Sequence, residues 1–188
     1  MHAQDILDHA LTGPLRIDAL PLPGAGTLGL CHCPGRNGTD GKGRVWRREL
    51  GADFSALEAW GATLLVSFVE SHEFAKLGVP DFAPAAGTRR FAWHHVPIPD
   101  MRAPQEATLE AWARSGPQVI AALRRGERVA LHCAAGMGRT GSMAAKLLVA
   151  FGVPAEDAIL QVRAARPGTI ESAEQEAFVR DPAALPVP

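Results

Sequence analysis

The sequence predicts one α/β domain with a central, mostly parallel sheet flanked by helices on both faces. Three observations predict this fold class. The chain has 188 residues and is 47% hydrophobic, which suits a single domain of 1–188 with enough apolar material for one sizeable core. Short apolar runs alternate with segments of helical periodicity, and no repeat or linker divides them. Residues 63–69 (TLLVSFV) form an apolar and β-branched run typical of a strand covered on both faces of a parallel sheet.

The N-terminal part is expected to hold little regular structure. Residues 1–45 are interpreted as a helical or irregular lead-in followed by two extended apolar segments, at 15–20 and 27–32. Gly, Pro, Asn and Asp gather in 34–43, which predicts turns there rather than the interior of an element.

Helices and strands then alternate along the chain. A first helix is expected from Asp53, taken as its N-cap, to Gly61, with Phe54, Leu57 and Trp60 on its apolar face. Besides 63–69, strands are predicted at 90–96 and 128–132. The segment 97–104 is too rich in proline to be anything but an ordered loop. Further helices are predicted at 71–77, at 105–125 with Gly116-Pro117 as a point of kinking or division, and at 142–151, 154–166 and 172–180.

The segment 132–140 (HCAAGMGRT) carries the chemistry. It joins a predicted strand to a predicted helix, with Arg139 six residues after Cys133. Glycines at 136 and 138 let the backbone curl so that its N–H groups converge on an anion, and the helix that follows adds its positive end. The Arg139 guanidinium can grip two oxygens of a phosphate. Below such a cradle we expect the Cys133 thiol to ionise at neutral pH, which makes it a nucleophile toward bound phosphorus.

A reaction at phosphorus also needs a proton donor for the leaving oxygen. Asp100, in the loop after the predicted strand 90–96, is our candidate, because parallel sheets bring the loops at the carboxyl ends of their strands into one crevice. The alternative is a turn carboxylate that only caps a neighbouring amide.

Residues 132–141 (HCAAGMGRTG), together with 97–104 (PIPDMRAP), resemble the Cys-based protein phosphatases. The similarity is greatest to the compact dual-specificity class and, within it, to the kinase-associated phosphatase type. It extends to LGLCHCPG, WGATLLVSFVESHE and RPGTIESAEQEAF, and so covers about 26–180.

The resemblance implies a two-step reaction. Cys133 attacks phosphorus while Asp100 protonates the leaving group, and water activated by Asp100 then hydrolyses the phosphocysteine. Thr140 matches the hydroxyl that donates to the Cys133 sulfur. No metal or other cofactor is needed. The phosphate is held by Arg139 and by the backbone amides of the loop, which are those of Ala134, Ala135, Gly136, Met137, Gly138 and Arg139.

The substrate is expected to be a phosphorylated protein or peptide, with phosphotyrosine preferred over phosphoserine and phosphothreonine. Similar phosphatases that act on inositol lipids tend to carry lysines in the loop, where this chain has Ala134 and Met137. Basic side chains at 36, 42, 44, 47 and 48 could line a path to an acidic peptide or simply face solvent. A phosphoinositide phosphatase, a non-catalytic phosphate-binding module and a thiol oxidoreductase or arsenate reductase are the alternatives.

Several other residues have plain structural interpretations. His132 is expected to hydrogen-bond the neighbouring loop. Gln175 either positions water or, as we favour, completes a capping box with Ser172. Arg163 and Arg166 are interpreted as a solvated helix face, and the alternative for Arg166 is a place beside the substrate crevice. Cys31, His32 and Cys33 do not suit zinc, because alternate strand residues point to opposite faces, but a disulfide between Cys133 and Cys31 or Cys33 stays open.

The composition limits the kinds of partner and the cellular compartment that the protein can have. A formal net charge of −1, from 19 Lys and Arg against 20 Asp and Glu, disfavours binding to nucleic acid or anionic lipid through charge. Three cysteines cannot form a disulfide framework, and no signal-like or membrane-spanning run is present in the sequence. We therefore expect a cytoplasmic protein, and a monomer is the oligomeric state that we expect.

Overall fold

A computed structural model describes residues 11–41 and 43–185. Its main sheet has five strands in the order β1-β2-β7-β5-β6, of which only β1 is antiparallel to its neighbour. The mostly parallel sheet predicted from the sequence is therefore confirmed, although the first ten residues of the expected lead-in lie outside the described part. The strands are β1 (Asp18–Pro21), β2 (Thr27–Cys31), β5 (Ala62–Ser67), β6 (Ala92–His95) and β7 (Arg128–His132).

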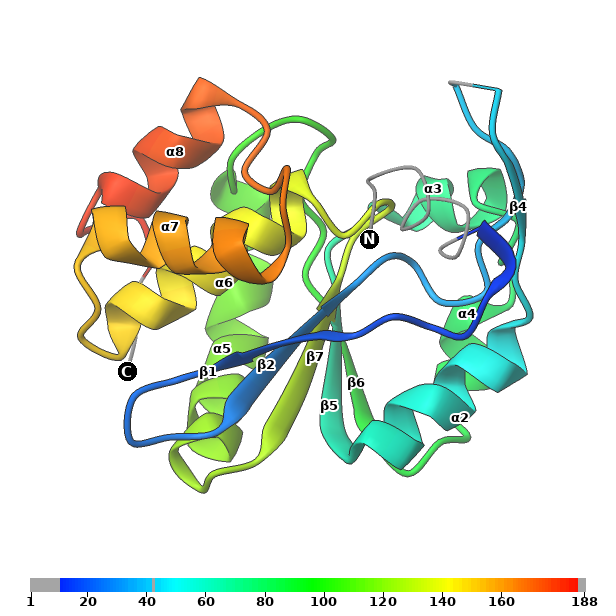
Figure 1. The fold of residues 1–188 in the computed structure, drawn as a ribbon, viewed down its shortest axis with the longest axis horizontal. Coiled ribbons are helices and arrows are strands. Elements are labelled where there is room, and N and C mark those ends of the chain that lie inside the picture. Colours follow the sequence, from blue (N-terminus) through cyan, green and yellow to red (C-terminus); the bar gives the residue numbers. More distant parts are fainter. Residues whose placement is uncertain (1–10, 42, 186–188) are drawn as a thin grey trace.

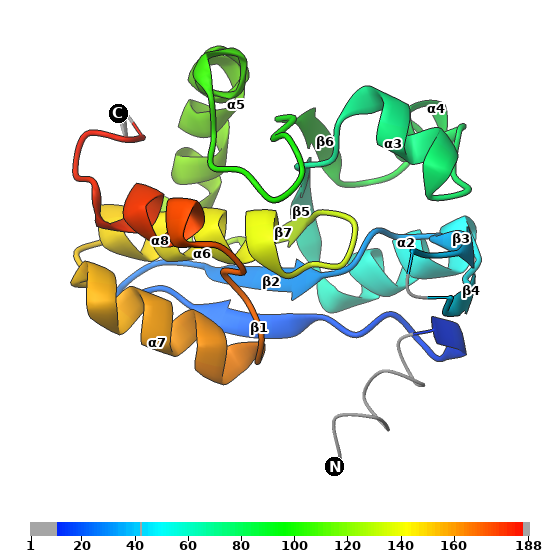
Figure 2. The ribbon, with the colours of Figure 1, turned by 90° about the horizontal axis from the view of Figure 1, so that it is seen from above.

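Helices cover both faces of this sheet (Figure 1). On one side lie α5 (Glu106–Arg124), α6 (Gly138–Ala150), α7 (Ala155–Ala165) and α8 (Ala173–Arg180). On the other lie α2 (Leu50–Trp60), α3 (Ser71–Lys76) and α4 (Phe82–Ala86). Figure 2 shows the two groups of helices on either side of the strands, so the predicted layering is confirmed.

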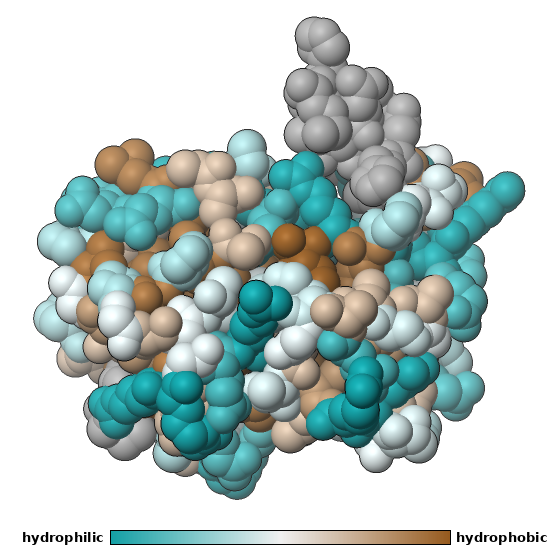
Figure 3. All heavy atoms as spheres, turned by 60° about the horizontal axis from the view of Figure 1, so that its bottom comes forward, coloured by the Kyte–Doolittle hydropathy of each residue, from teal (hydrophilic) through white to brown (hydrophobic). Residues whose placement is uncertain are grey.

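The core lies between the central strands and these helices. Leu28, Leu30, Leu131 and Val66, from three adjacent strands, are fully buried, and such burial of apolar side chains is the main favourable contribution to folding. Figure 3 brings the lower ends of the strands forward and shows hydrophilic residues around small groups of apolar ones. The opposite, upper ends of the parallel strands carry the candidate site.

A small hairpin replaces the expected loop at 34–43. Its strands are β3 (Asn37–Thr39) and β4 (Val45–Arg47). The turn between them is held by Asp40, whose carboxylate accepts hydrogen bonds from the indole of Trp46 and from Arg44. The Gly, Asn and Asp that suggested turns thus belong to a hairpin, and the prediction missed its two short strands.

Asp53 is not the N-cap of α2. The helix begins three residues earlier, and the carboxylate of Glu49 caps it by accepting from the N–H groups of Gly51 and Ala52. Asp53 is buried in the first turn, where it pairs with Arg48 at 2.6 Å and accepts from the N–H of Gly35. Gly61 ends the helix, as predicted, and it does so in the left-handed conformation.

Two other helical predictions need correction, and one helix was missed. α5 is a continuous helix that contains Pro117, so Gly116-Pro117 does not divide it. α6 begins at Gly138, four residues before the predicted start, because the phosphate loop turns directly into helix. The short helix α4 was not predicted.

Candidate active site

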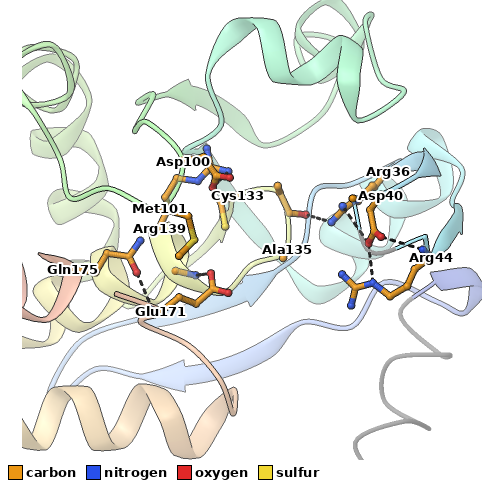
Figure 4. Close-up of a pocket in the computed structure, with 13 residues that line it drawn as sticks. Arg36, Asp40, Arg44, Asp100, Met101, Cys133, Ala135, Arg139, Glu171 and Gln175 are labelled. Carbon is orange, nitrogen blue, oxygen red and sulfur yellow. Dashed lines mark hydrogen bonds and ion pairs between the residues drawn. The ribbon is translucent and has the colours of Figure 1, made fainter. Parts of the chain in front are cut away.

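The loop of residues 133–138 joins β7 to α6 at the carboxyl edge of the sheet (Figure 4). It passes so close to β2 that a Cβ atom at Gly136 would lie 2.2 Å from the carbonyl oxygen of Cys31. Gly136 also has φ +69°, which favours glycine. Both constraints require the glycine that the motif supplies.

The carbonyl groups of this loop point outward and are bound by side chains. Arg166 donates to the carbonyl oxygens of Ala135 and Gly136, at 3.0 and 2.7 Å. Arg36 donates to that of Ala134 at 3.1 Å. Across 11–41 and 43–185, no acceptor is bonded to the backbone N–H groups of 134–137. A loop with bound carbonyls and unbonded N–H groups is suited to an anion.

His132 anchors the first residue of the loop. Its Nδ1 lies 3.1 Å from the carbonyl oxygen of Cys133, and its Nε2 lies 2.5 Å from the Ser67 hydroxyl, which accepts from the indole of Trp93. Burial lowers the pKa of His132 to about 3. The neutral ring donates through Nδ1–H to the Cys133 carbonyl and accepts from Ser67, so the structural role predicted for His132 is confirmed.

Arg139 is buried behind the loop and faces two carboxylates. Glu73, on α3, accepts from both of its terminal nitrogens at 2.6 and 3.0 Å, and the carbonyl of Ile98 accepts at 3.1 Å. Asp100 Oδ1 lies 3.0 Å from Nη2. Burial lowers the pKa of Arg139, but the contact with Glu73 and the charges of Cys133 and Asp100 raise it overall. Glu73 lies in the segment WGATLLVSFVESHE (60–73), but no feature of its local sequence indicates a role at the site.

The loop that carries Asp100 is tied to the start of α8. Ser172 donates to the carbonyl of Met101 at 3.2 Å, and the Glu174 carboxylate accepts from the N–H of Ala103 at 3.1 Å. Met101 has a left-handed φ of +60°, which is strained for a side chain of this type. The Asp100 side chain itself is 68% exposed.

One pocket of about 280 Å³ brings most of the predicted site residues together. Cys133, Asp100 and Arg139 line its centre, while Arg36, Asp40 and Arg44 reach it from the β3–β4 hairpin (Figure 4). Ala134, Ala135, Gly138, Glu171 and Gln175 also line it, whereas Gly136, Met137 and Thr140 do not.

Three sequence interpretations change at this site. Arg166 is not on a solvated helix face but binds the phosphate loop and pairs with Asp18 at 2.6 Å. Gln175 completes only half of the capping box: Ser172 accepts from its N–H, but its side chain accepts from the N–H of Glu171 at 2.9 Å. The Thr140 hydroxyl is buried and has no hydrogen-bond partner among the described residues, so the contact with Cys133 that the resemblance implies is not formed here.

The remaining cysteines are buried free thiols, as is Cys133. Burial raises the pKa of Cys31 to about 12 and that of Cys33 well above its ordinary value. Neither thiol therefore ionises readily at neutral pH.

The described residues hold neither a cluster of metal ligands nor a membrane-spanning helix. Within them, no group of three or more His, Cys, Asp or Glu side chains could hold a metal ion. No helix in the same part of the chain has the length and apolar character needed to span a bilayer.

Comparisons with known proteins agree with this geometry. A family model described as "Polymorphic toxin system, DSP-PTPase phosphatase" matches residues 40–153. Cyclin-dependent kinase inhibitor 3 of Sus scrofa is 28% identical over 174 residues, which are 89% of this chain and 78% of the relative. The mouse protein of that name is 27% identical over 173 residues, with the same coverage.

Solved structures of phosphatases also match this chain. A crystal structure of kinase-associated phosphatase, with serine in place of its catalytic site cysteine, matches at a TM-score of 0.75 and 26% identity and covers 88% of this chain and 92% of that one. A putative protein tyrosine phosphatase from Leishmania major shares the fold at a TM-score of 0.64 and 21% identity, covering 89% and 97%.

Proposed function

The chain belongs to the DSP-PTPase phosphatase family of polymorphic toxin systems and is a phosphoric monoester hydrolase, and we propose that it dephosphorylates protein side chains through a phosphocysteine on Cys133. The main support for this proposal is the arrangement of side chains in one pocket. A cysteine lies at the base of a loop whose N–H groups at 134–137 have no acceptor among the described residues, with an arginine and an exposed carboxylate beside it.

In the first step the Cys133 sulfur attacks phosphorus and the bond from phosphorus to the leaving oxygen breaks. Asp100 gives its proton to that oxygen. In the second step water attacks the phosphocysteine, Asp100 takes a proton from the water, and the bond between phosphorus and sulfur breaks to give phosphate and the thiolate. The loop amides and Arg139 hold the oxygens on which charge is redistributed. The Thr140 hydroxyl, which has no hydrogen-bond partner among the described residues, is proposed to turn toward the departing sulfur and donate to it.

The contacts of Arg139 suggest how phosphate and Asp100 share it. Glu73 and the Ile98 carbonyl take three of its five N–H donors, and Asp100 lies at Nη2. A phosphate that binds to Nε–H and to Nη2 therefore displaces Asp100 from the guanidinium. The displaced carboxyl group is then available to the leaving oxygen.

The absence of lysines in the loop, at Ala134 and Met137, favours one phosphate on a protein side chain over a multiply phosphorylated inositol lipid. The similarity to a kinase-associated phosphatase supports the same substrate class. Phosphotyrosine is proposed as the preferred residue, with phosphoserine and phosphothreonine as further substrates.

The test is turnover of an aryl phosphate, such as p-nitrophenyl phosphate, in the presence of a metal chelator. We expect the wild type to be active and Cys133→Ser to lose turnover while it still binds inorganic phosphate. Activity of the serine variant, or loss of wild-type activity with the chelator, would overturn the mechanism. Rates on phosphotyrosine peptide, phosphothreonine peptide and phosphoinositide vesicles then identify the substrate, and faster turnover of the lipid would favour the phosphoinositide alternative.

A further inference from the structure

Glu171 places a carboxylate on the phosphate loop itself. Its Oε2 accepts from the backbone N–H of Gly138 at 2.8 Å (Figure 4), whereas the N–H groups of 134–137 have no acceptor among the described residues. Glu171 lines the same pocket as Cys133. An anionic group of the chain thus occupies one donor of a loop that is otherwise open to an anion.

The surroundings of Glu171 hold it in this position. Its own N–H donates to the Gln175 side chain at 2.9 Å. The residue before it, Ile170, has a left-handed φ of +59°, and its carbonyl accepts from Arg163 at 3.1 Å. A Cβ atom at Gly138 would lie 2.7 Å from Glu171 Oε2, so the carboxylate packs directly against the loop. A non-glycine residue held at positive φ beside a pocket is typical of a functional constraint.

We propose that Glu171 determines substrate specificity by competing with the phosphoryl group for the Gly138 amide. This inference rests on the proposed function, because it assigns Glu171 a role at the same phosphate loop. A phosphate that uses all the loop amides must displace the carboxylate, since two anions cannot share one N–H donor without strong repulsion. Binding of any oxyanion is weakened by the cost of that displacement.

The charge distribution of the pocket indicates which substrates reduce this cost. Arg36 and Arg44 lie on the hairpin side, while Glu171 lies on the side of α8 (Figure 4). A displaced Glu171 can pair with a cation next to the phosphorylated residue, but it repels a second anion there. The favoured substrate is therefore a phosphopeptide with a Lys or Arg beside the phosphorylated residue, directed toward α8.

Binding of inorganic phosphate, measured by calorimetry, tests the competition without any turnover. We expect Glu171→Gln and Glu171→Ala to bind phosphate more tightly than the wild type. The gain for the alanine variant should be roughly tenfold, the size of one charge-assisted hydrogen bond. Glu110→Gln, which removes the same charge from an exposed position on α5 outside the pocket, is the matched control and should leave affinity unchanged. Equal binding by the wild type and both Glu171 variants would overturn the inference.

Two matched phosphotyrosine peptides, one with Lys and one with Glu beside the phosphotyrosine, test the specificity. We expect the wild type to have a higher kcat/KM for the lysine peptide and Glu171→Gln to lose most of that preference. An unchanged preference in the variant would overturn the inference while leaving the phosphatase proposal intact. If wild type and variants alike bind no phosphate, the proposed function fails as well.

Discussion

At the scale of single residues, two carboxylates share one guanidinium and differ in how freely they can leave it. The Glu73 side chain is 12% exposed and accepts from both terminal nitrogens of Arg139, which helps to hold the pKa of Glu73 below its ordinary value although burial raises it. The Asp100 side chain is 68% exposed and lies at one nitrogen. A proton donor must reach the leaving group, so Asp100 suits that role, while Glu73 suits the fixing of Arg139.

Replacement of Asp100 tests this assignment. We expect Asp100→Ala to lower kcat/KM, which reports only the steps up to release of the leaving group, by about 10²–10⁴ on an alkyl phosphate or phosphotyrosine, because general acid catalysis contributes about that factor when the leaving group is poor. On an aryl phosphate with a good leaving group the loss should be much smaller. Asp157→Ala, on the surface of α7, is the control. Equal losses on both kinds of substrate would show that Asp100 does not protonate the leaving group.

The sequence predicted some residues of this site and missed others, because local spacing does not show contacts between distant segments. Cys133 and Arg139 are found by their spacing in one loop, and Asp100 by its place after a strand. The partner of Arg139, by contrast, lies 66 residues away on a short helix, and only the packing of α3 against the sheet edge brings Glu73 there. Glu171 was within a segment of recognised similarity, but its contact with Gly138 spans 33 residues.

At the scale of elements, α7 supports the phosphate loop through the residue that follows it. Arg166 has an extended backbone, so it leaves the helix and turns toward the loop. The prediction that Arg166 lies on a solvated helix face was wrong, because the predicted helix was one residue too long. Arg166 also pairs with Asp18 of β1, and so connects the sheet edge, α7 and the loop.

Arg166→Met keeps much of the apolar stem and removes these contacts. We expect the free energy of unfolding to fall by about 2 to 4 kcal/mol, since buried carbonyls and a carboxylate lose their partner. We also expect kcat/KM to fall by at least about tenfold, because a displaced loop amide costs about one hydrogen bond to phosphate. Arg180→Met is the control: it also removes three contacts, but exposed ion pairs contribute little. Similar losses of stability in both variants, measured by urea unfolding, would contradict the special role of Arg166.

At the scale of the whole molecule, the strand order explains why distant segments form one pocket. β7 and β6 lie on either side of β5, so the loops that follow them, with Cys133 and Asp100, are one strand apart at the same edge. Alternating strands and helices were sufficient to predict this crevice. The β3–β4 hairpin on its other side was not predictable in the same way, because its strands are three residues each and are held by the side chain of Asp40.

The buried histidines make the stability of the folded protein depend on pH. Burial lowers the pKa of His132 from 6.5 to about 3 and that of His32 well below 6.5. Between about pH 3 and pH 6.5 the unfolded chain therefore binds more protons than the folded one, so stability is present above pH 6.5 and is lost as the pH falls. The raised pKa values of Cys31 and Cys33 act in the opposite direction above about pH 9, where unfolded thiols ionise. Stability should be greatest between about pH 7 and pH 8.5.

Urea unfolding between pH 5 and pH 7 tests this coupling. Each histidine that takes up a proton on unfolding should contribute a slope of up to about 1.4 kcal/mol per pH unit to the free energy of unfolding. His32→Gln removes one such group, whose Nε2 is buried without a hydrogen-bond partner in the described structure. We expect the variant to have a shallower slope by about one proton, whatever its stability at pH 7. An unchanged slope would mean that His32 is already charged in the folded protein, and the lowered pKa would then be wrong.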